Sequence, residues 1–303
     1  MKLNIKNETS KLKAVILGVA DSNGSKPSLE EAYDPKSMKH IKEGTYPEEK
    51  DMIDEMESVA EILKKHNVEV LRPRIIKDYN QIFSRDIGFV IDDKFVYANI
   101  LPDREKEIKA IDYILDEIEA DNKIRLSEPC HVEGGDVMPH GDYLLVGTYR
   151  GEDYSDFITA RTNVEAVEEL RQLFPDKIVK SFNLRKSNTD PKANALHLDC
   201  CFQPVGDKYA IIHKNGFLEE EEYEWLLNLY GAENVFEISA QEMYDMNSNI
   251  FSISEKIVIS DHHFNRLNTW LRSKGILVET VNYREIAKQE GLLRCSTLPL
   301  IRE

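Results

Sequence analysis

Residues of chemically reactive types stand immediately before five short apolar runs. These polar groups are Ser84-Arg85-Asp86, Glu133-Gly134-Gly135-Asp136, His197-Leu198-Asp199, Met246-Asn247-Ser248-Asn249 and Arg294-Cys295. If the runs are strands arranged around one axis, the strands begin close to that axis. We therefore expect Asp86, Glu133, His197, Asp199 and Cys295 to face one central cavity.

This combination of side chains suits a guanidinium group. Carboxylates bind a planar guanidinium through forked hydrogen bonds, and two of them on opposite sides leave its carbon facing a thiolate. Because that carbon is a poor electrophile, the reaction needs a soft nucleophile and a proton donor for the leaving amine, which a cysteine and a histidine supply. The alternation of His197 and Asp199 predicts that both side chains lie on one face of a strand.

Cys295 is the expected nucleophile. It lies eight residues from the end of the chain, before an apolar run that contains Leu298, Leu300 and Ile301. Chain ends fray unless a sheet holds them, and this run is suited to pairing in a sheet. The alternative is a small buried hydrophobe, the commoner role of a cysteine. A bound cation and His197 beside the thiol predict an environment that favours the thiolate.

Paired apolar runs joined by polar turns recur along the chain and predict strand pairs. The pairs are 88–98, 135–147, 198–213 and 249–260, with a fifth assembled from 297–301 beside 13–18. Amphipathic segments predict helices at 47–66, from 103 to 118, at 162–173, 219–230 and 264–271. Third strands follow most of these helices, at 68–71, 177–180, 234–236 and 276–281.

The order of these elements predicts an α/β fold of five units of strand, strand, helix and strand, the last closed by both termini. A ring of such units is a five-bladed α/β propeller, and we expect it to form a single domain over residues 1–303. The stretch 21–44 is rich in turn-forming residues and is too long for a simple connection. It is a candidate lid or substrate loop, and a merely mobile loop is the alternative.

Composition narrows the classes of partner. The chain has 303 residues with 41% hydrophobic and 31% charged side chains, and no apolar run approaches a membrane helix. Four cysteines in so long a chain do not form a disulfide framework, and the first residues lack the apolar stretch of a signal peptide, so we expect a cytoplasmic protein. The net charge of −16 argues against nucleic acid and anionic membranes and is compatible with a small cationic substrate.

Five stretches, in this order, resemble the guanidino-group-modifying enzymes: arginine deiminases, dimethylarginine hydrolases, arginine dihydrolases and amidinotransferases. The stretches are KLKAVILG (11–18), FSRD (83–86), EGGDV (133–137), HLD (197–199) and RCSTLPLIRE (294–303). The resemblance covers essentially the whole chain. It implies the five-bladed α/β propeller, or pentein, fold.

The resemblance also implies a role for each motif residue. Cys295 would form a covalent amidino-thioether with the substrate, and His197 would protonate the leaving amine and then activate water. Asp86 and Asp199 would bind the guanidinium nitrogens, and Glu133, a further catalytic residue, would sit beside His197 and hold the guanidinium or steer protons. No metal and no organic cofactor is implied. The sequence leaves the oligomeric state open, a homo-oligomer included.

Two features bear on the reaction and the substrate. The Glu-Gly-Gly-Asp sequence at residues 133–136 resembles the hydrolase branch. The alternatives are an amidinotransferase and a non-catalytic propeller binding module. Arginine deiminases place a carboxylate-binding arginine five residues before the nucleophile, where this chain has Glu290. Arg161 resembles another carboxylate-binding arginine of the family. Further candidates for the substrate pocket are Asn249, Asn247 and Arg185.

Overall fold

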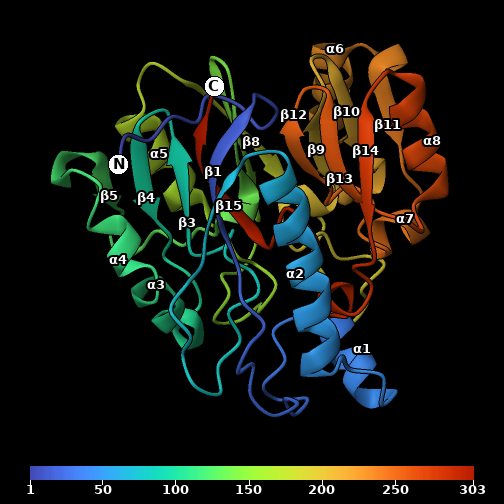
Figure 1. Ribbon diagram of the computed structural model, residues 1–303. Helices are drawn as coiled ribbons and strands as arrows, with labels where there is room; N and C mark the ends of the chain where they lie inside the picture. Colours follow the sequence, from blue (N-terminus) through green and yellow to red (C-terminus); the bar gives the residue numbers. More distant parts are fainter.

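The computed structural model describes all 303 residues, and its strands form five separate three-stranded sheets (Figure 1). The strands are β1 (Leu12–Leu17), β2 (Glu69–Leu71), β3 (Gly88–Ile91), β4 (Lys94–Tyr97), β5 (Lys123–Arg125), β6 (Val137–His140), β7 (Tyr143–Thr148), β8 (Ile178–Asn183), β9 (Phe202–Val205), β10 (Tyr209–Ile212), β11 (Val235–Glu237), β12 (Phe251–Ser254), β13 (Ile257–Asp261), β14 (Leu277–Val281) and β15 (Thr297–Arg302). The α-helices are α1 (Pro35–Lys42), α2 (Glu49–Lys65), α3 (Lys106–Lys109), α4 (Asp112–Leu115), α5 (Val164–Leu173), α6 (Glu220–Tyr230), α7 (Ala240–Tyr244) and α8 (Asn265–Ser273).

Every sheet repeats one pattern of pairing. In the sheet β6-β7-β8, the first two strands are antiparallel and β8 runs parallel to β7 after the crossover through α5. The sheets β3-β4-β5, β9-β10-β11, β12-β13-β14 and β15-β1-β2 have the same order of antiparallel and parallel pairs. A parallel pair needs such a crossover. The predicted unit of strand, strand, helix and strand is therefore confirmed, as a small mixed sheet that stays open at both edges.

The two ends of the chain share one sheet. β15 pairs antiparallel with β1, with Thr297 opposite Leu17 and Arg302 opposite Leu12. The backbone N–H of Asn4 donates to the carbonyl of Leu300 at 3.1 Å. The predicted pairing of 297–301 with 13–18 is confirmed, and it holds the segment around Cys295 in place.

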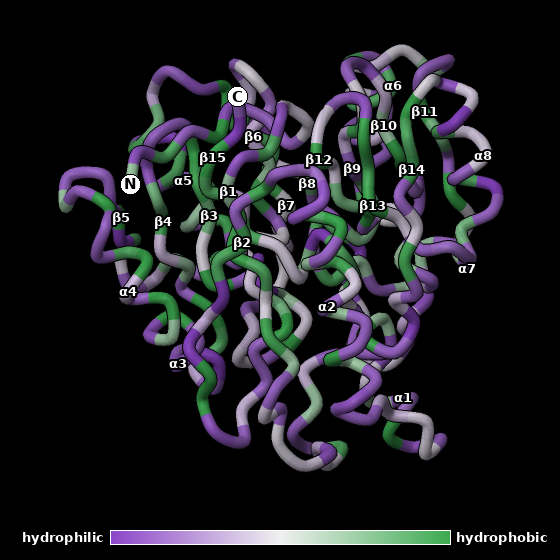
Figure 2. Tube along the Cα trace, in the orientation of Figure 1, coloured by the Kyte–Doolittle hydropathy of each residue, from purple (hydrophilic) through white to green (hydrophobic).

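The strands carry the apolar side chains and the loops carry most of the polar ones (Figure 2). Strands such as β10 and β13 read as near-continuous apolar runs because both of their faces are buried. The predicted apolar stripe of α2 is buried as well, at Met52, Met56, Val59, Ala60 and Leu63. None of the helices combines the length and the apolar character that a membrane crossing requires.

The helix predicted from 103 to 118 is instead broken into a 3-10 turn, α3 and α4. The backbone explains the break. The carbonyl of Ala110, which a continuous helix would use internally, accepts a hydrogen bond at 2.9 Å from the N–H of Arg74. The short strand β5 that follows was not predicted.

The stretch 21–44 was expected to lack regular structure, and it contains α1. Asp34 caps this helix by accepting a hydrogen bond from the N–H of Ser37 at 2.6 Å, and Pro35 occupies the first helical position. An aspartate followed by proline is a recognised start of a helix, so the signal was present in the sequence.

Candidate active site

A cavity of about 510 Å³ brings together residues from distant parts of the chain. Four of the predicted site residues line it: Asp86, Arg161, His197 and Cys295. Three others lie directly behind its wall, each at most 1% exposed: Glu133, Asp199 and Asn249. Of the five residues expected to face one cavity, Asp86, His197 and Cys295 line it, whereas Glu133 and Asp199 lie behind them.

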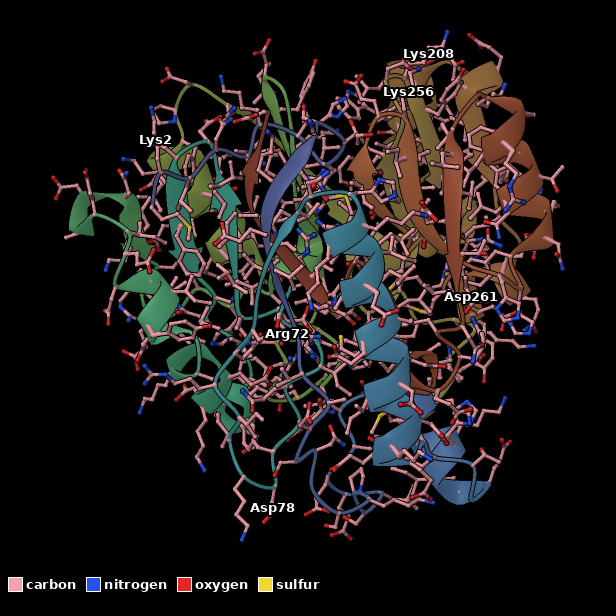
Figure 3. The ribbon with its side chains drawn as sticks, viewed as in Figure 1. Lys2, Arg72, Asp78, Lys208, Lys256 and Asp261 are labelled. Atoms are coloured by element: carbon pink, nitrogen blue, oxygen red, sulfur yellow. The ribbon has the colours of Figure 1, made fainter.

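Loops form the mouth of the cavity. The stretch 21–44 contributes several lining residues, among them Asn23, Tyr33 and Asp34, as a substrate loop would. Asp78 also lines the cavity, and Figure 3 shows it at the end of the molecule opposite the hairpin turns that carry Lys208 and Lys256. The cavity therefore opens at the end of the fold away from these turns.

His197 and Glu133 each stand in extended backbone directly before a single 3-10 turn. The turns span Leu198–Cys200 and Gly134–Asp136. The prediction that His197 and Asp199 alternate along one strand is wrong, because Asp199 lies inside the first turn and β9 begins only after it. Each turn places polar side chains at the start of the strand pair that follows it, although these residues are not themselves part of a strand.

Asp136 holds these two turns together, a role that the sequence analysis did not assign. Its carboxylate accepts hydrogen bonds from the N–H of Leu198 at 2.8 Å and from the hydroxyl of Thr162 at 2.7 Å. The packing is so close that a Cβ atom on Gly135 would lie 2.6 Å from the ring of His197. A glycine is therefore needed at this position for the imidazole to occupy its place.

His197 is surrounded by carboxylates. Its Nε2 lies 2.7 Å from Glu133 Oε2 and its Nδ1 lies 3.9 Å from Asp86 Oδ1. Burial alone would lower the pKa of His197, but Asp86 and the hydrogen bond with Glu133 outweigh it and raise the pKa above its ordinary 6.5. The surrounding carboxylates therefore favour the protonated imidazole, which can donate a proton.

Asn249 positions the thiol of Cys295. Its Nδ2 lies 3.1 Å from the sulfur, and its Oδ1 accepts from the N–H of Cys295 at 3.1 Å. Asp199 lies behind the sulfur, with carboxylate oxygens at 3.7 and 3.9 Å. Burial raises the pKa of the thiol well above 9, and the carboxylates of Asp199 and Asp86 raise it further. The thiolate-favouring environment was predicted for a cavity that holds a cation, and without a cation the environment of Cys295 favours the thiol.

This environment predicts slow, strongly pH-dependent alkylation of Cys295. In the ligand-free protein, the rate with iodoacetamide should keep rising between about pH 7 and 10, because the thiolate fraction grows with pH below the pKa. Peptide mass spectrometry would measure each cysteine separately, and the buried Cys130 serves as the comparison because it does not line the cavity. A rate for Cys295 that levels off near pH 7 would contradict the raised pKa.

Arg294 is the largest addition to the predicted site. It is fully buried and donates from Nη1 to Asp199 Oδ2 at 2.8 Å, while Nε and Nη2 reach the carboxylate of Glu8 at 3.2 and 3.1 Å. Asp199 was predicted to bind substrate nitrogens, and in the structure it already binds this internal guanidinium.

Both arginines that line the cavity are also committed to partners. Arg161 was expected to hold a substrate carboxylate, but its Nη1 donates to Glu133 at 3.0 Å and its other nitrogens donate to the carbonyls of Tyr33 and Ile158. Arg104, which the sequence analysis missed, donates to Asp86 Oδ2 at 2.8 Å and to Glu107. Oδ1 of Asp86 is left without a partner, as is Nδ1 of His197.

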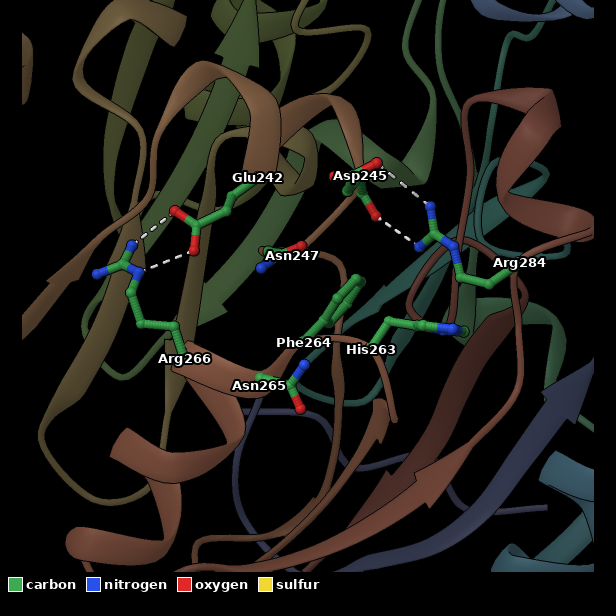
Figure 4. Close-up of a pocket in the computed structure, with 8 residues that line it drawn as sticks. All are labelled: Glu242, Asp245, Asn247, His263, Phe264, Asn265, Arg266 and Arg284. Atoms are coloured by element: carbon green, nitrogen blue, oxygen red, sulfur yellow. Dashed lines mark hydrogen bonds and ion pairs between the residues drawn. The ribbon is translucent and has the colours of Figure 1, made fainter.

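Two further candidates lie away from this cavity. Arg185 donates from Nε to the carbonyl of Asn215 at 2.8 Å and does not line the cavity. Asn247 lines a second pocket, between the ion pairs Glu242–Arg266 and Asp245–Arg284 (Figure 4). Neither residue is positioned to contact a substrate next to Cys295.

Two clusters have the ligand types of a metal site. One is Asp86, Glu133 and His197, with ligand atoms within 4.8 Å of one another, and the other is Asp261 with His262 and His263. In the first cluster, both carboxylates already bind arginine, and the raised pKa of His197 disfavours the neutral imidazole that a metal requires as a ligand. In the second, Asp261 is taken up by hydrogen bonds to His263 and to the N–H of Tyr283.

Comparisons with known proteins agree with this arrangement. The sequence profile of a family described as "N,N dimethylarginine dimethylhydrolase, eukaryotic" matches residues 29–302. The uncharacterized protein YkgA of Bacillus subtilis (strain 168) is 29% identical over 251 residues, covering 82% of this chain and 80% of that protein. An arginine deiminase of Listeria welshimeri is 27% identical over 210 residues, covering 58% of this chain and only 48% of the deiminase.

Solved structures show the same fold at low sequence identity. The N-terminal domain of ArgZ, an arginine dihydrolase from the ornithine-ammonia cycle in cyanobacteria, superposes with a TM-score of 0.77 at 15% identity, over 95% of this chain and 98% of that one. The amidinotransferase SxtG of Microseira wollei gives a TM-score of 0.77 at 16% identity, over 99% and 97% of the two chains.

Fold, motifs and relatives together define a guanidino-group-modifying protein. Within this superfamily, the chain belongs to the N,N-dimethylarginine dimethylhydrolase family, because the profile of that family spans nearly all of it.

Proposed function

We propose that this protein is a cysteine-dependent hydrolase that acts on the guanidinium group of arginine or an arginine-like compound. One observation carries the proposal. Cys295, His197 and Asp86 line one cavity, where the pKa of His197 is raised and Oδ1 of Asp86 has no partner. This set provides a nucleophile, an acid and a binding group for a nitrogen cation.

The first step is formation of the thiolate in the presence of substrate. Asp86 Oδ1 accepts a hydrogen bond from the guanidinium, whose positive charge comes close to the sulfur. This charge offsets the effect of the nearby carboxylates and lowers the pKa of Cys295, so the thiol loses its proton to solvent only when a cation is bound. The thiolate then attacks the guanidinium carbon and forms a neutral tetrahedral adduct.

The second step transfers the proton of His197. The imidazolium protonates the nitrogen that leaves, the C–N bond breaks, and a cationic amidino-thioether remains on Cys295. The now neutral imidazole takes a proton from water as the water oxygen attacks the same carbon. The C–S bond then breaks as the hydroxyl proton of the adduct passes to the sulfur, which releases a neutral ureido product and restores the thiol. Glu133 keeps the imidazole in place and stabilises its protonated form.

The architecture proposed for this site is a five-bladed α/β propeller in a single domain over residues 1–303. Five equivalent strand-strand-helix-strand units support it, as does the fifth unit's assembly from both ends of the chain. In this arrangement, the segments that precede the first strand of each unit surround the pseudo-fivefold axis and form the cavity.

A panel of guanidines tests the proposed reaction. The protein would be incubated with arginine, N-methylated arginines, agmatine and simple alkylguanidines, with and without an amine acceptor such as glycine or ornithine. Ammonia, alkylamine and ureido product would be measured, and intact mass would report any adduct on the protein. We expect release of ammonia or alkylamine without an acceptor, together with an amidino adduct that Cys295→Ser lacks.

Other outcomes would indicate the alternatives. Turnover that requires the acceptor amine would identify an amidinotransferase, the activity named for SxtG. If no guanidine in the panel is consumed and no adduct forms on Cys295, the hydrolase proposal is wrong, and a non-catalytic binding module becomes the better interpretation.

A further inference from the structure

The cavity wall carries a pair of carboxylic acids that the proposed reaction does not use. Asp34 and Glu290 both line the cavity and are only 6% and 4% exposed. They come from opposite ends of the sequence and their side chains lie within hydrogen-bonding contact of each other. Buried acids that face a cavity together are unusual unless a ligand or a cation satisfies them.

Glu290 is held in an unfavourable backbone conformation. Its φ of 58° and ψ of 29° are left-handed, a conformation that is strained for a non-glycine residue. Asn194 Nδ2 donates to its Oε1 at 2.6 Å and the N–H of Lys36 donates to its Oε2 at 3.3 Å. Strain of this kind is concentrated at functional sites, and here it fixes a carboxylate in the cavity wall.

The nearest lysine does not neutralise this pair from within the cavity. The ammonium of Lys36 donates to the carbonyl of Tyr244 and lies 4.6 Å from the centre of the Tyr244 ring, and Lys36 does not line the cavity. Burial raises the pKa of Glu290 well above 4.5, and the carboxyl of Asp34 raises it further. A positive group bound in the cavity would relieve this repulsion.

The rest of the cavity wall also favours a positive group over a negative one. Further carboxylates line it, at Asp86, Asp103 and Glu107, and the two arginines in the wall already have partners. An α-carboxylate, as in arginine or dimethylarginine, would meet negative charge in this cavity. An ammonium group would instead find acceptors already in place.

We infer that the preferred substrate is a guanidine whose other end carries an ammonium group and no carboxylate, and that Asp34 and Glu290 accept the hydrogen bonds of that ammonium. The inference rests on the proposed function for the placement of the guanidinium beside Cys295. It assigns to Glu290 the recognition of the ammonium group at the end of the substrate opposite the guanidinium.

Binding measurements test this selectivity separately from catalysis. Calorimetry with the Cys295→Ser protein would compare agmatine (4-aminobutylguanidine), butylguanidine and arginine. Agmatine should bind about tenfold or more tightly than either of the others, the expected effect of hydrogen bonds to a charged group. Adding Glu290→Gln should weaken agmatine binding by about tenfold and leave butylguanidine within about twofold.

The control is Glu61→Gln in the same background, the same chemical change on the exposed face of α2, which should leave all three affinities unchanged. Retained binding of butylguanidine shows that Glu290→Gln is folded. Arginine binding as tightly as agmatine, or no binding of any of the three, would overturn the inference. Selective agmatine binding without turnover by the wild-type protein would support it and count against the hydrolase proposal alone.

Discussion

Replacing Cys295 with serine is expected to lower turnover of every guanidine that the protein consumes by at least about a thousandfold. The guanidinium carbon is a poor electrophile, and a hydroxyl is far harder to deprotonate than a thiol. The site offers little help from a general base, because the carboxylates around His197 favour its protonated form and Asp199 is bound to Arg294. Only a group that ionises when the cation arrives can act as the nucleophile here.

The matched control is Cys130→Ser. Cys130 is also buried, but it contacts Glu169 and Ser127 and does not line the cavity. This variant should keep its turnover, while Cys295→Ser keeps its secondary structure and its affinity for substrate. Steady-state kinetics measures the turnover of the two variants, and circular dichroism measures their secondary structure. A Cys295→Ser protein with more than a tenth of the wild-type kcat would show that the thiol is not the nucleophile.

The sequence motifs identified residues that line one cavity because each motif is a local signal. Asp86, His197 and Cys295 stand just before apolar runs, and the five repeated units bring these positions together. Strand pairs and most helices were predictable for the same reason, since periodicity is a property of neighbouring residues. The helix from 103 to 118 was mispredicted because a backbone hydrogen bond from a distant residue, Arg74, interrupts it.

The contacts that complete the site could not be predicted because they join residues far apart in sequence. Glu8 and Arg294 are separated by 286 positions, and Asn249 and Cys295 by 46. The strand geometry predicted for His197 was wrong because the Asp136 carboxylate binds the backbone of the next residue and favours a turn. Side-chain to backbone bonds of this kind leave no periodic pattern in a sequence.

Arg294→Met is expected to give the largest loss of stability, about 3–5 kcal/mol in the free energy of unfolding. The arginine is fully buried and neutralises both Glu8 and Asp199. Its Nη1 and Nη2 also donate to the carbonyls of Gly135 and Val137, next to the turn that follows Glu133. Methionine fills similar volume but leaves Asp199 buried without its arginine and leaves Glu8 with only the longer ion pair to Arg85 at 3.7 Å. Denaturant-induced unfolding at neutral pH measures the effect.

The pH dependence distinguishes this mechanism from a simple packing defect. Burial alone would raise the pKa of Glu8, but Arg294 and Arg85 outweigh it and lower the pKa from 4.5 to about 2. This group therefore stabilises the wild-type fold above about pH 4.5, and the contribution is lost as the pH falls toward 2. In Arg294→Met, Glu8 and Asp199 take up protons more readily, so the loss in the free energy of unfolding relative to wild type should become smaller as the pH falls from about 7 to 5. Lys13→Met, which removes the exposed ion pair with Glu303, should leave the free energy of unfolding nearly unchanged at both pH values. A deficit in Arg294→Met that stays constant with pH would mean that lost packing, not uncompensated charge, explains the effect.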